Sequence, residues 1–330
     1  MDVTTLQALP PRQSADVLAL SIRATTHDGV KPLSEQTVID LRRLPGEGAV
    51  SSATTHLIVF DRPGEIDARM LGYAHVEHHA QSNPAESKDP AAYELVVHPD
   101  HRGQGIGGGL LGEVLARWPG ARGWAHGNSD AAAHLAASRG LHSVRELWKM
   151  DRPLPTHHGG AGARDLPEVD LPEGFAVRSF EVGRDEETWL SVNAQAFADH
   201  DEQGRTTLAD LQDRISETWF DPHGFLLVED VSGPSPELAA FHWTKVEPAE
   251  PGSSHSTAGE VYVVGVAPAY QGRGVGTATT LLGLRHLAAC GLSNVTLYVD
   301  GDNAAAVATY RRLGFDRSSV DVMYAESASL

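Results

Sequence analysis

The sequence predicts an α/β fold that is built from two copies of one unit. The chain has 330 residues, which is enough for two domains of about 150 residues each. The segments 94–115 and 263–284 match without a gap at an offset of 169 residues. The matched positions are Val97, Pro99, Gly103, Gly105 and Gly107 in the first copy and Val266, Pro268, Gly272, Gly274 and Gly276 in the second. A Pro- and Gly-rich segment lies between the copies, so we expect domains at 1–152 and 173–330 and a linker at 153–172.

Both copies show the same succession of predicted elements. An apolar strand runs into a glycine-rich turn, and a helix follows the turn. Further along, the Ala-rich segments 128–141 and 302–315 each predict a helix that ends at a glycine in the cap position. Loop-forming segments at 79–91 and 247–259 precede the two apolar strands. The shared order supports the duplication of one αβ unit.

Composition and charge exclude several classes of function. A total of 44 acidic against 26 basic residues gives a formal net charge of −18, which repels nucleic acid and anionic membrane surfaces. The N-terminus has no basic segment followed by an apolar core, and no run of about 18 uncharged apolar residues occurs. The single cysteine, Cys290, lies in an apolar helical segment and is predicted to be a small buried side chain. We expect a cytoplasmic monomer without nucleic-acid or membrane partners.

The glycine-rich turns predict phosphate binding. A strand, a glycine-rich turn and a helix bring successive backbone N–H groups and the positive end of the helix dipole to one point. The first copy also fits the dinucleotide pattern G-x-G-x-x-G at 103–108, but the second has Thr277 in place of the third glycine, and no acidic residue ends a strand near Arg122. No G-x-x-x-x-G-K-[ST] pattern is present. The alternative is that the glycines only permit a tight turn, and the duplication of the turn with its flanks disfavours it.

The second copy resembles the acetyl-CoA signature of the GCN5-related N-acetyltransferase (GNAT) superfamily. Residues 271–276 match Q-x-x-G-x-G/A, and residues 303–315 match N-x-x-A-x-x-x-Y-x-x-x-G-F. The resemblance implies two tandem GNAT domains, each with a mixed, mainly antiparallel sheet flanked by helices, and acetyl-CoA as the acetyl donor. The implied acetyl-CoA contacts are Leu95, Val96, Val97, Gly103, Gln104, Gly105, Ile106, Gly107 and Gly108 in the first half, and Val264, Gly265, Val266, Gln271, Gly272, Arg273, Gly274, Val275, Gly276, Thr277, Asn303, Ala304, Ala305, Ala306, Val307 and Ala308 in the second.

Catalytic groups are predicted in the second half. Glu260 opens an apolar strand and, at a period of two, shares a face with Tyr262 and Val264 beside the expected coenzyme A arm, where its carboxylate is a candidate base. Tyr310 lies two helical turns after Asn303 and is a candidate acid for the departing thiolate.

The first half lacks both candidate groups. Ala91 and Ala136 stand at the corresponding places, and Glu94 is expected to face away from the position of Ala91. We expect the first domain to bind acetyl-CoA without transferring its acetyl group.

Several strings are similar to those of the mycothiol synthase family, among them PLSEQ at 32–36, AFADHDEQG at 196–204 and FHWTKVE at 241–247. This resemblance implies acetylation of the cysteinyl amine of desacetylmycothiol, with substrate contacts from Glu35, Glu202, Lys245, Glu260 and Tyr298. Two alternatives stay open. One is a tandem GNAT protein that acetylates another small-molecule or protein amine, and the other is a non-catalytic acyl-CoA sensor.

No metal is expected. The string HVEHH at 75–79 is the densest histidine cluster, but no further carboxylate or cysteine completes a convincing site, and direct acetyl transfer needs no metal.

Overall fold

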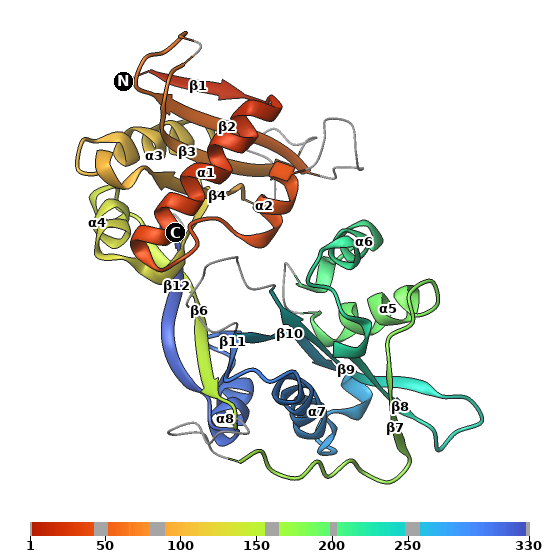
Figure 1. Ribbon diagram of the computed structural model, residues 1–330. Helices are drawn as coiled ribbons and strands as arrows, with labels where there is room; N and C mark the ends of the chain where they lie inside the picture. Colours follow the sequence, from red (N-terminus) through yellow and green to blue (C-terminus); the bar gives the residue numbers. More distant parts are fainter. Residues whose placement is uncertain are drawn as a thin grey trace. The chain divides into compact units, whose positions relative to one another are not determined.

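The computed structural model describes residues 2–42, 52–65, 67–79, 90–155, 165–198, 203–247 and 258–327. The strands in these ranges are β1 (Val3–Leu6), β2 (Ser52–Phe60), β3 (Met70–His79), β4 (Ala92–Val97), β5 (Arg122–Ala125), β6 (His142–Pro153), β7 (Phe175–Ser179), β8 (Phe225–Asp230), β9 (Glu237–Val246), β10 (Gly259–Val266), β11 (Asn294–Asp300) and β12 (Asp316–Ala325). The α-helices are α1 (Pro11–Asp28), α2 (Glu35–Arg42), α3 (Ile106–Arg117), α4 (Asp130–Ser138), α5 (Glu186–Ala196), α6 (Leu208–Ser216), α7 (Val275–Ala289) and α8 (Ala304–Arg312). Figure 1 traces them along the chain.

The chain forms two compact units. Unit 1 contains Met1–Leu147 and Ser319–Leu330, and unit 2 contains Trp148–Ser318. The division near the middle agrees with the repeat, but the last twelve residues belong to unit 1, although they were expected in the second domain. Of the expected linker at 153–172, residues 156–164 lie outside the described part of the chain.

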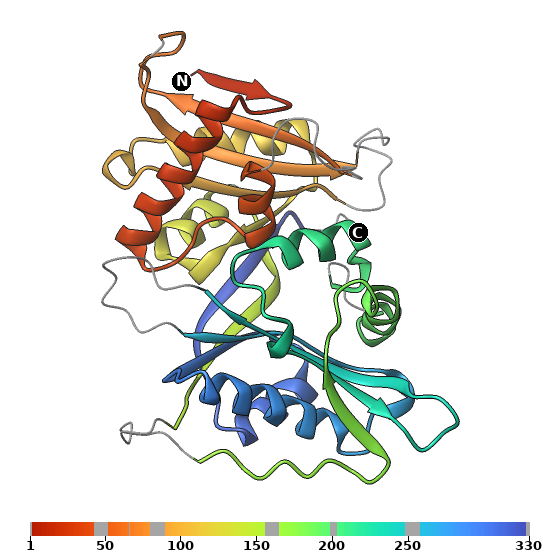
Figure 2. The same cartoon turned by 45° about the vertical axis from the view of Figure 1, so that its right-hand side comes forward.

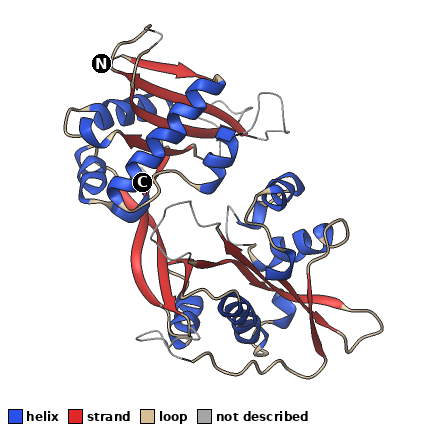
Figure 3. Cartoon of the chain, viewed as in Figure 1, coloured by secondary structure: helices blue, strands red, loops and turns tan. Residues whose placement is uncertain are grey.

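Both units contain the same mixed, mainly antiparallel sheet. The strand order is β1-β2-β3-β4-β5-β12 in unit 1 and β6-β11-β10-β9-β8-β7 in unit 2. In the described part of the chain, β4 pairs with β5 and β10 with β11 in parallel, whereas β1–β2, β2–β3, β3–β4, β5–β12, β7–β8, β8–β9 and β9–β10 are antiparallel pairs. Figure 3 shows the helices that flank these strands. The tandem α/β fold predicted from the repeat is therefore confirmed.

The final strands of the two copies are exchanged. In unit 1, β5 pairs with β12 through the register Val322 to Ala125, although β12 follows α8 of unit 2. In unit 2, the place beside β11 is taken by β6, which follows α4 of unit 1. Each sheet is thus completed by a strand whose preceding helix belongs to the other copy.

In unit 1, helices cover both faces of the sheet. One core joins α1 and α2 to β2, β3 and β4, with Val17, Leu41 and Tyr73 among its buried members. The other joins α3 and α4 to the opposite face, with Leu110, Val114 and Ala136 among its members. Complete burial of an apolar side chain of this size contributes about 1.5–3 kcal/mol, so the two cores hold the glycine-rich turn between β4 and α3 in place.

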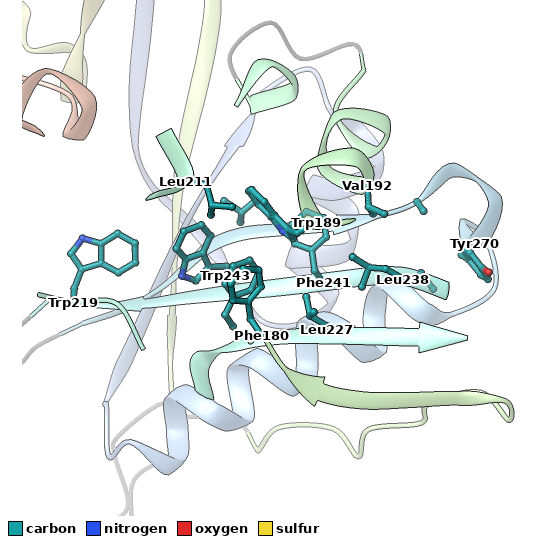
Figure 4. Close-up of a cluster of buried hydrophobic side chains, with 14 residues drawn as sticks. Phe180, Trp189, Val192, Leu211, Trp219, Leu227, Leu238, Phe241, Trp243 and Tyr270 are labelled. Carbon is teal, nitrogen blue, oxygen red and sulfur yellow. The ribbon is translucent and has the colours of Figure 1, made fainter. Parts of the chain in front are cut away.

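Unit 2 repeats this arrangement with a larger aromatic core. Helices α5 and α6 cover one face of its sheet and α7 and α8 the other, as Figure 2 shows. On the α5 side, Trp243 stacks on Phe225 with ring centroids 4.4 Å apart and meets Trp189 edge-to-face at 5.8 Å. Figure 4 shows Trp243 and Trp189 among the buried side chains of this core. Aromatic pairs of this kind add about 0.5–1.5 kcal/mol beyond the burial of their area.

Cys290 departs from its expected burial. It is exposed because α7 ends at Ala289 and Cys290 is the cap residue beyond the apolar stripe of the helix. Its Sγ lies 3.7 Å from Nε2 of His286. In the described part of the chain, none of the helices is long and apolar enough to cross a membrane.

Candidate active site

The glycine-rich turns have the backbone conformation that a phosphate site needs. Gly272 and Gly274 have φ angles of 76° and 84°, and Gly103 and Gly105 have 74° and 83°. Residues with a side chain rarely adopt this left-handed region, so these positions require glycine. Gly274 and Gly105 are the N-cap residues of α7 and α3, whose first N–H groups are thereby free to point toward an anion.

Each turn is fastened to the strand before it in the same way. Nε2 of Gln271 donates a hydrogen bond to the carbonyl of Val266 at 3.3 Å in unit 2. Nε of Arg102, which aligns with Gln271, donates to the carbonyl of Val97 at 3.2 Å in unit 1. The guanidinium of Arg102 also forms a paired contact with Asp28 at 2.7 and 2.6 Å, so its charge is neutralised within unit 1.

The strands on either side of the expected coenzyme A arm diverge. Gly259, Glu260 and Val261 pair with β11, whereas β10 continues to pair with β9 as far as Val266. In unit 1, only Ala92 and Tyr93 pair with β5. Beyond these pairs, the edge of β10 that faces β11, and the edge of β4 that faces β5, offer main-chain groups. An extended amide-containing chain can bind to such groups as an added strand. The pantetheine of coenzyme A is such a chain.

A β-bulge in β10 changes the directions of its side chains. The register with β9 shifts between Val261 and Val263. Val261 and Val264 both pack in the core of α7 and α8, whereas Tyr262 and Val263 both pack in the core of α5 and α6. The strict alternation assumed from the sequence therefore fails at Val264, because a bulge inserts one extra residue and reverses the faces beyond it.

Glu260 lies before the bulge, beside a buried cation. It is paired in register with Lys245 on β9 and with Thr296 on β11. The side chain of Lys245 is only 6% exposed, and its Nζ lies 4.9 Å from the ring centre of Trp219 and 3.2 Å from a carboxylate oxygen of Glu247. A cation over an aromatic face is attracted by the ring quadrupole, so the indole of Trp219 stabilises the ammonium group of Lys245. Glu260 and Lys245 are thus brought together as adjacent residues at the point where the strands diverge.

Tyr310 has the properties of a proton donor. It is half-buried on α8, its ring meets Phe315 edge-to-face at 5.9 Å, and burial raises the pKa of its phenol to about 12. A phenol with a raised pKa keeps its proton at neutral pH and can donate a hydrogen bond to an anion such as a thiolate.

Three further predicted site residues of unit 2, Tyr298, Asn303 and Val307, differ in exposure and in contacts. Tyr298 on β11 is 44% exposed. Oδ1 of Asn303 accepts a hydrogen bond from the backbone N–H of Ala306 at 3.1 Å and so caps α8. Val307 is 6% exposed and packs in the core, so its side chain is not available to acetyl-CoA, because α8 turns this face toward the sheet.

A cavity of about 780 Å³ lies in unit 1 between β4, β5, α3 and α4. Ligand-binding clefts are commonly 300–1,000 Å³ in volume. Eight of the nine expected acetyl-CoA contacts of the first half line the cavity, Gln104 being the exception. The lining contacts are Leu95, Val96, Val97, Gly103, Gly105, Ile106, Gly107 and Gly108.

Two expected substrate contacts do not lie among the described residues of unit 2. Glu35 is a half-buried residue of unit 1 and opens α2. Glu202 lies outside the described residues. The histidine cluster at 75–79 provides no visible metal site: His75 is buried beside Tyr73, and the described ranges contain no group of three His, Cys, Asp or Glu side chains that could hold a metal ion.

The sequence did not reveal a buried charged cluster in unit 1. The ring of His126 lies between Glu94 and Asp321, with both distances 2.9 Å. Glu94 was expected to face away from the place of a base, and the structure shows that its carboxylate is occupied by this histidine and by the N-terminus of α2. No local pattern signals the cluster, because His126 and Asp321 are 195 residues apart.

Comparison with known protein families agrees with this geometry. The acetyltransferase (GNAT) family matches residues 188–315, and an acetyltransferase (GNAT) domain matches residues 54–140. Among solved structures, a tandem GNAT protein from the clavulanic acid biosynthesis pathway is similar with a TM-score of 0.69 at 17% identity, over 100% of this chain and 99% of that one. A GCN5-related N-acetyltransferase from Sphaerobacter thermophilus has a TM-score of 0.61 at 20% identity, with 98% and 95% covered. At such identities the likeness establishes the fold.

Sequence relatives are closer. A mycothiol acetyltransferase of Thermobispora bispora is 48% identical over 315 residues, which are 95% of this chain and 96% of the relative. A mycothiol acetyltransferase of Streptomyces coelicolor is 47% identical over 323 residues, with 98% and 94% covered. These identities extend through both units, and the resemblance stated from the sequence is confirmed. The chain therefore belongs to the mycothiol acetyltransferase family and is built from two acetyltransferase (GNAT) domains.

Proposed function

We propose that this protein transfers the acetyl group of acetyl-CoA to the cysteinyl amine of desacetylmycothiol, which yields mycothiol and coenzyme A. Unit 2 carries the reaction, and unit 1 binds acetyl-CoA without transferring its acetyl group. The observation that carries the proposal is the near full-length relationship to mycothiol acetyltransferases, together with a carboxylate and a phenol that only the second copy has.

Glu260 is proposed as the base. An ammonium group must lose a proton before its nitrogen can attack a thioester carbonyl. Glu260 lies where β10 leaves β11, next to the edge that is suited to the pantetheine arm, and accepts this proton directly or through water. Acetyl-CoA supplies the thioester, and the departing group is a thiolate.

Tyr310 is proposed as the acid that protonates this thiolate. The coenzyme A thiolate, whose conjugate thiol has a pKa near 8.5, is a much stronger base than water, so a nearby donor that protonates it as the C–S bond breaks speeds its departure. The pKa of Tyr310 near 12 keeps the phenol protonated at neutral pH, so its proton is available as negative charge develops on the sulfur, and the tyrosinate that results regains a proton from solvent.

Four further side chains are proposed to bind the acceptor together with Glu260. Lys245 and Tyr298 have donor groups suited to the hydroxyls of a sugar–inositol conjugate, whereas Glu35 and Glu202 are carboxylates suited to an ammonium group or a hydroxyl. The net charge of −18 favours the approach of a cationic amine over that of an anion.

Unit 1 is proposed to hold acetyl-CoA in its cavity as a non-transferring site. Its turn has the same φ angles as that of unit 2, and its cavity is lined by the expected contacts. The alignment places Ala91 and Ala136 where Glu260 and Tyr310 stand in the second copy, so neither proton transfer has a side chain to perform it. We further propose that the protein acts as a monomer in the cytoplasm, in keeping with its single cysteine and its acidic charge.

Mass spectrometry of an amine panel tests this function. The purified protein is incubated with acetyl-CoA and desacetylmycothiol, a polyamine, an aminoglycoside or a lysine peptide, and the acetylated products are identified. The expected result is one acetyl group on the cysteinyl amine, in preference to the other amines. Preferred acetylation of another amine would reject the acceptor, and binding of acetyl-CoA without transfer to any amine would favour an acyl-CoA sensor.

The two catalytic roles are tested by matched substitutions. Glu260→Gln and Tyr310→Phe each remove a proton-transfer group and keep the shape of the side chain, and we expect kcat to fall about 10²–10⁴-fold. Tyr298→Phe is the control, because it removes an exposed phenol that is proposed only to bind the acceptor and should raise KM more than it lowers kcat. Wild-type turnover in Glu260→Gln or Tyr310→Phe would remove that residue from the mechanism.

A further inference from the structure

His126 forms the centre of a buried charged cluster in unit 1. Its Nε2 lies 2.9 Å from Oε1 of Glu94, and its Nδ1 lies 2.9 Å from Oδ2 of Asp321. Although burial opposes a charge on the ring, the hydrogen bonds to Asp321 and Glu94 raise the pKa of His126 to about 10. Both ring nitrogens of the imidazolium therefore donate, one to each carboxylate.

Asp321 connects this cluster to the exchanged strand. Besides the contact with His126, its Oδ1 accepts a hydrogen bond of 2.7 Å from the backbone N–H of Gly127. Asp321 lies on the part of β12 that belongs to unit 1, next to Val322, which pairs with Ala125. The C-terminal strand thus fixes both the ring of His126 and the backbone after it.

Glu94 connects the cluster to α2. Both of its carboxylate oxygens lie 3.0 Å from the backbone N–H of Ser34, and Oγ1 of Thr37 donates to Oε2 at 2.9 Å. These groups surround the start of α2, where a negative charge is stabilised by the helix dipole. Glu35 and Gln36 lie between these two residues in the first turn of α2, and the proposed function assigns Glu35 to the acceptor.

The contacts form one continuous chain from β12 to α2. Asp321 holds His126, His126 holds Glu94, and Glu94 holds Ser34 and Thr37 on either side of Glu35. Glu94 is 5% exposed and Thr37 is 3% exposed, so water does not readily replace these partners. Loss of one partner leaves a buried carboxylate without its hydrogen bond, and α2 then has to shift to restore it.

We propose that His126 is a positioning residue for the acceptor: through Glu94, it fixes the first turn of α2 and thereby the side chain of Glu35. The inference rests on the proposed function, because it needs Glu35 to bind the acceptor. His126 touches neither the acceptor nor the reacting atoms in this scheme. A misplacement of about 1 Å in a substrate-positioning group can cost about 10²-fold in rate or affinity.

Steady-state kinetics of His126→Gln test the proposal. We expect the KM for desacetylmycothiol to rise about tenfold, while kcat and the KM for acetyl-CoA stay within twofold of the wild type. His142→Gln is the matched control, because His142 is an exposed histidine of unit 1 that neither belongs to the cluster nor lines the cavity proposed for acetyl-CoA. An equal rise of KM in the control would overturn the proposal.

Thr37 provides a second, conservative pair. Thr37→Val removes the hydroxyl that donates to Glu94 and keeps the side-chain shape, whereas Thr37→Ser keeps the hydroxyl. We expect Thr37→Val to raise the acceptor KM and Thr37→Ser to restore it. Hydrogen exchange of the amides at 34–38 should be faster in Thr37→Val and His126→Gln than in the wild type and in Thr37→Ser. Unchanged exchange with a raised KM would overturn the route through α2.

A double-mutant cycle links His126 to Glu35. If His126 acts through Glu35, then Glu35→Gln raises the acceptor KM, and adding His126→Gln raises it by less than in the wild-type background. Additive effects would overturn the proposal. Wild-type turnover with an unchanged acceptor KM in His126→Gln overturns the inference alone, whereas absence of transfer by the wild-type protein overturns the proposed function on which it rests.

Discussion

The two glycine turns permit a matched test of the proposed division between the units. Gly274 in unit 2 and Gly105 in unit 1 have φ angles of 84° and 83°, and each is the N-cap residue of the helix after the turn. A Cβ atom added at either position meets no atom within 4 Å. Gly274→Ala and Gly105→Ala therefore introduce the same backbone strain without a steric clash.

The size of this strain sets the expected effect. A residue with a side chain costs about 1–2 kcal/mol in the left-handed region. If the turn keeps its conformation, the free energy of unfolding of the substituted unit falls by this amount. The thermal unfolding midpoint of that unit then falls by about 2–4 °C per kcal/mol. If the turn relaxes instead, the amides no longer converge on one point, and acetyl-CoA binding at that unit weakens about 5–30-fold.

Calorimetry and initial rates give the two readouts. Titration calorimetry with acetyl-CoA should show weakened binding at one unit in each variant. Only Gly274→Ala should raise the KM for acetyl-CoA, and Gly105→Ala should keep wild-type kcat and KM. A folded Gly105→Ala variant that loses as much turnover as Gly274→Ala would refute the assignment of catalysis to unit 2 alone.

Three further predictions concern stability and reactivity. The raised pKa of His126 means that its stabilising contribution is complete below about pH 6.5 and is lost as the pH rises through about 10, so the difference in unfolding free energy between wild type and His126→Gln should be largest at pH 6; a constant difference would contradict the charged cluster. Trp243 is 1% exposed, and Trp243→Ala should lower the free energy of unfolding by about 3–5 kcal/mol in chemical denaturation, with Trp243→Phe costing less; equal losses would show that ring packing is not the cause. Cys290 is exposed, but partial desolvation of its thiol and the nearby carboxylate of Asp221 raise the pKa of the thiol. A maleimide should therefore label the native protein more slowly than free cysteine. Cys290→Ser should abolish labelling while leaving turnover unchanged.

The repeated turn was predictable because its requirements are local. A backbone position with a positive φ favours glycine, so such a turn can be recognised from its glycines in the sequence. The same glycine spacing in both copies identified both turns. The strands and helices beside them followed from hydrophobic periodicity, and the tandem fold followed from the repeat. The resemblance implied only that Lys245 and Glu260 contact the same substrate. The structure shows that the two residues lie opposite each other on the adjacent strands β9 and β10.

The bulge in β10 was not predictable in the same way. A period of two assigns Glu260, Tyr262 and Val264 to one face, and the extra residue between Val261 and Val263 moves Val264 to the other. Its sequence of valines and tyrosine is also compatible with regular alternation, so the irregularity depends on packing against both helical layers. The exposure of Cys290 has a similar cause, since α7 ends one residue before it.

The sequence by itself determined the duplicated αβ unit, the glycine turns and the family, because these rest on local conformation and on patterns that a repeat displays twice. Only the tertiary structure decided that β12 completes the sheet of unit 1 and that Glu94, His126 and Asp321 meet there. The two copies have the same strand order, so local sequence cannot tell which copy a final strand will join. That choice depends on pairing and burial between residues as distant in the sequence as Gly123 and Tyr324.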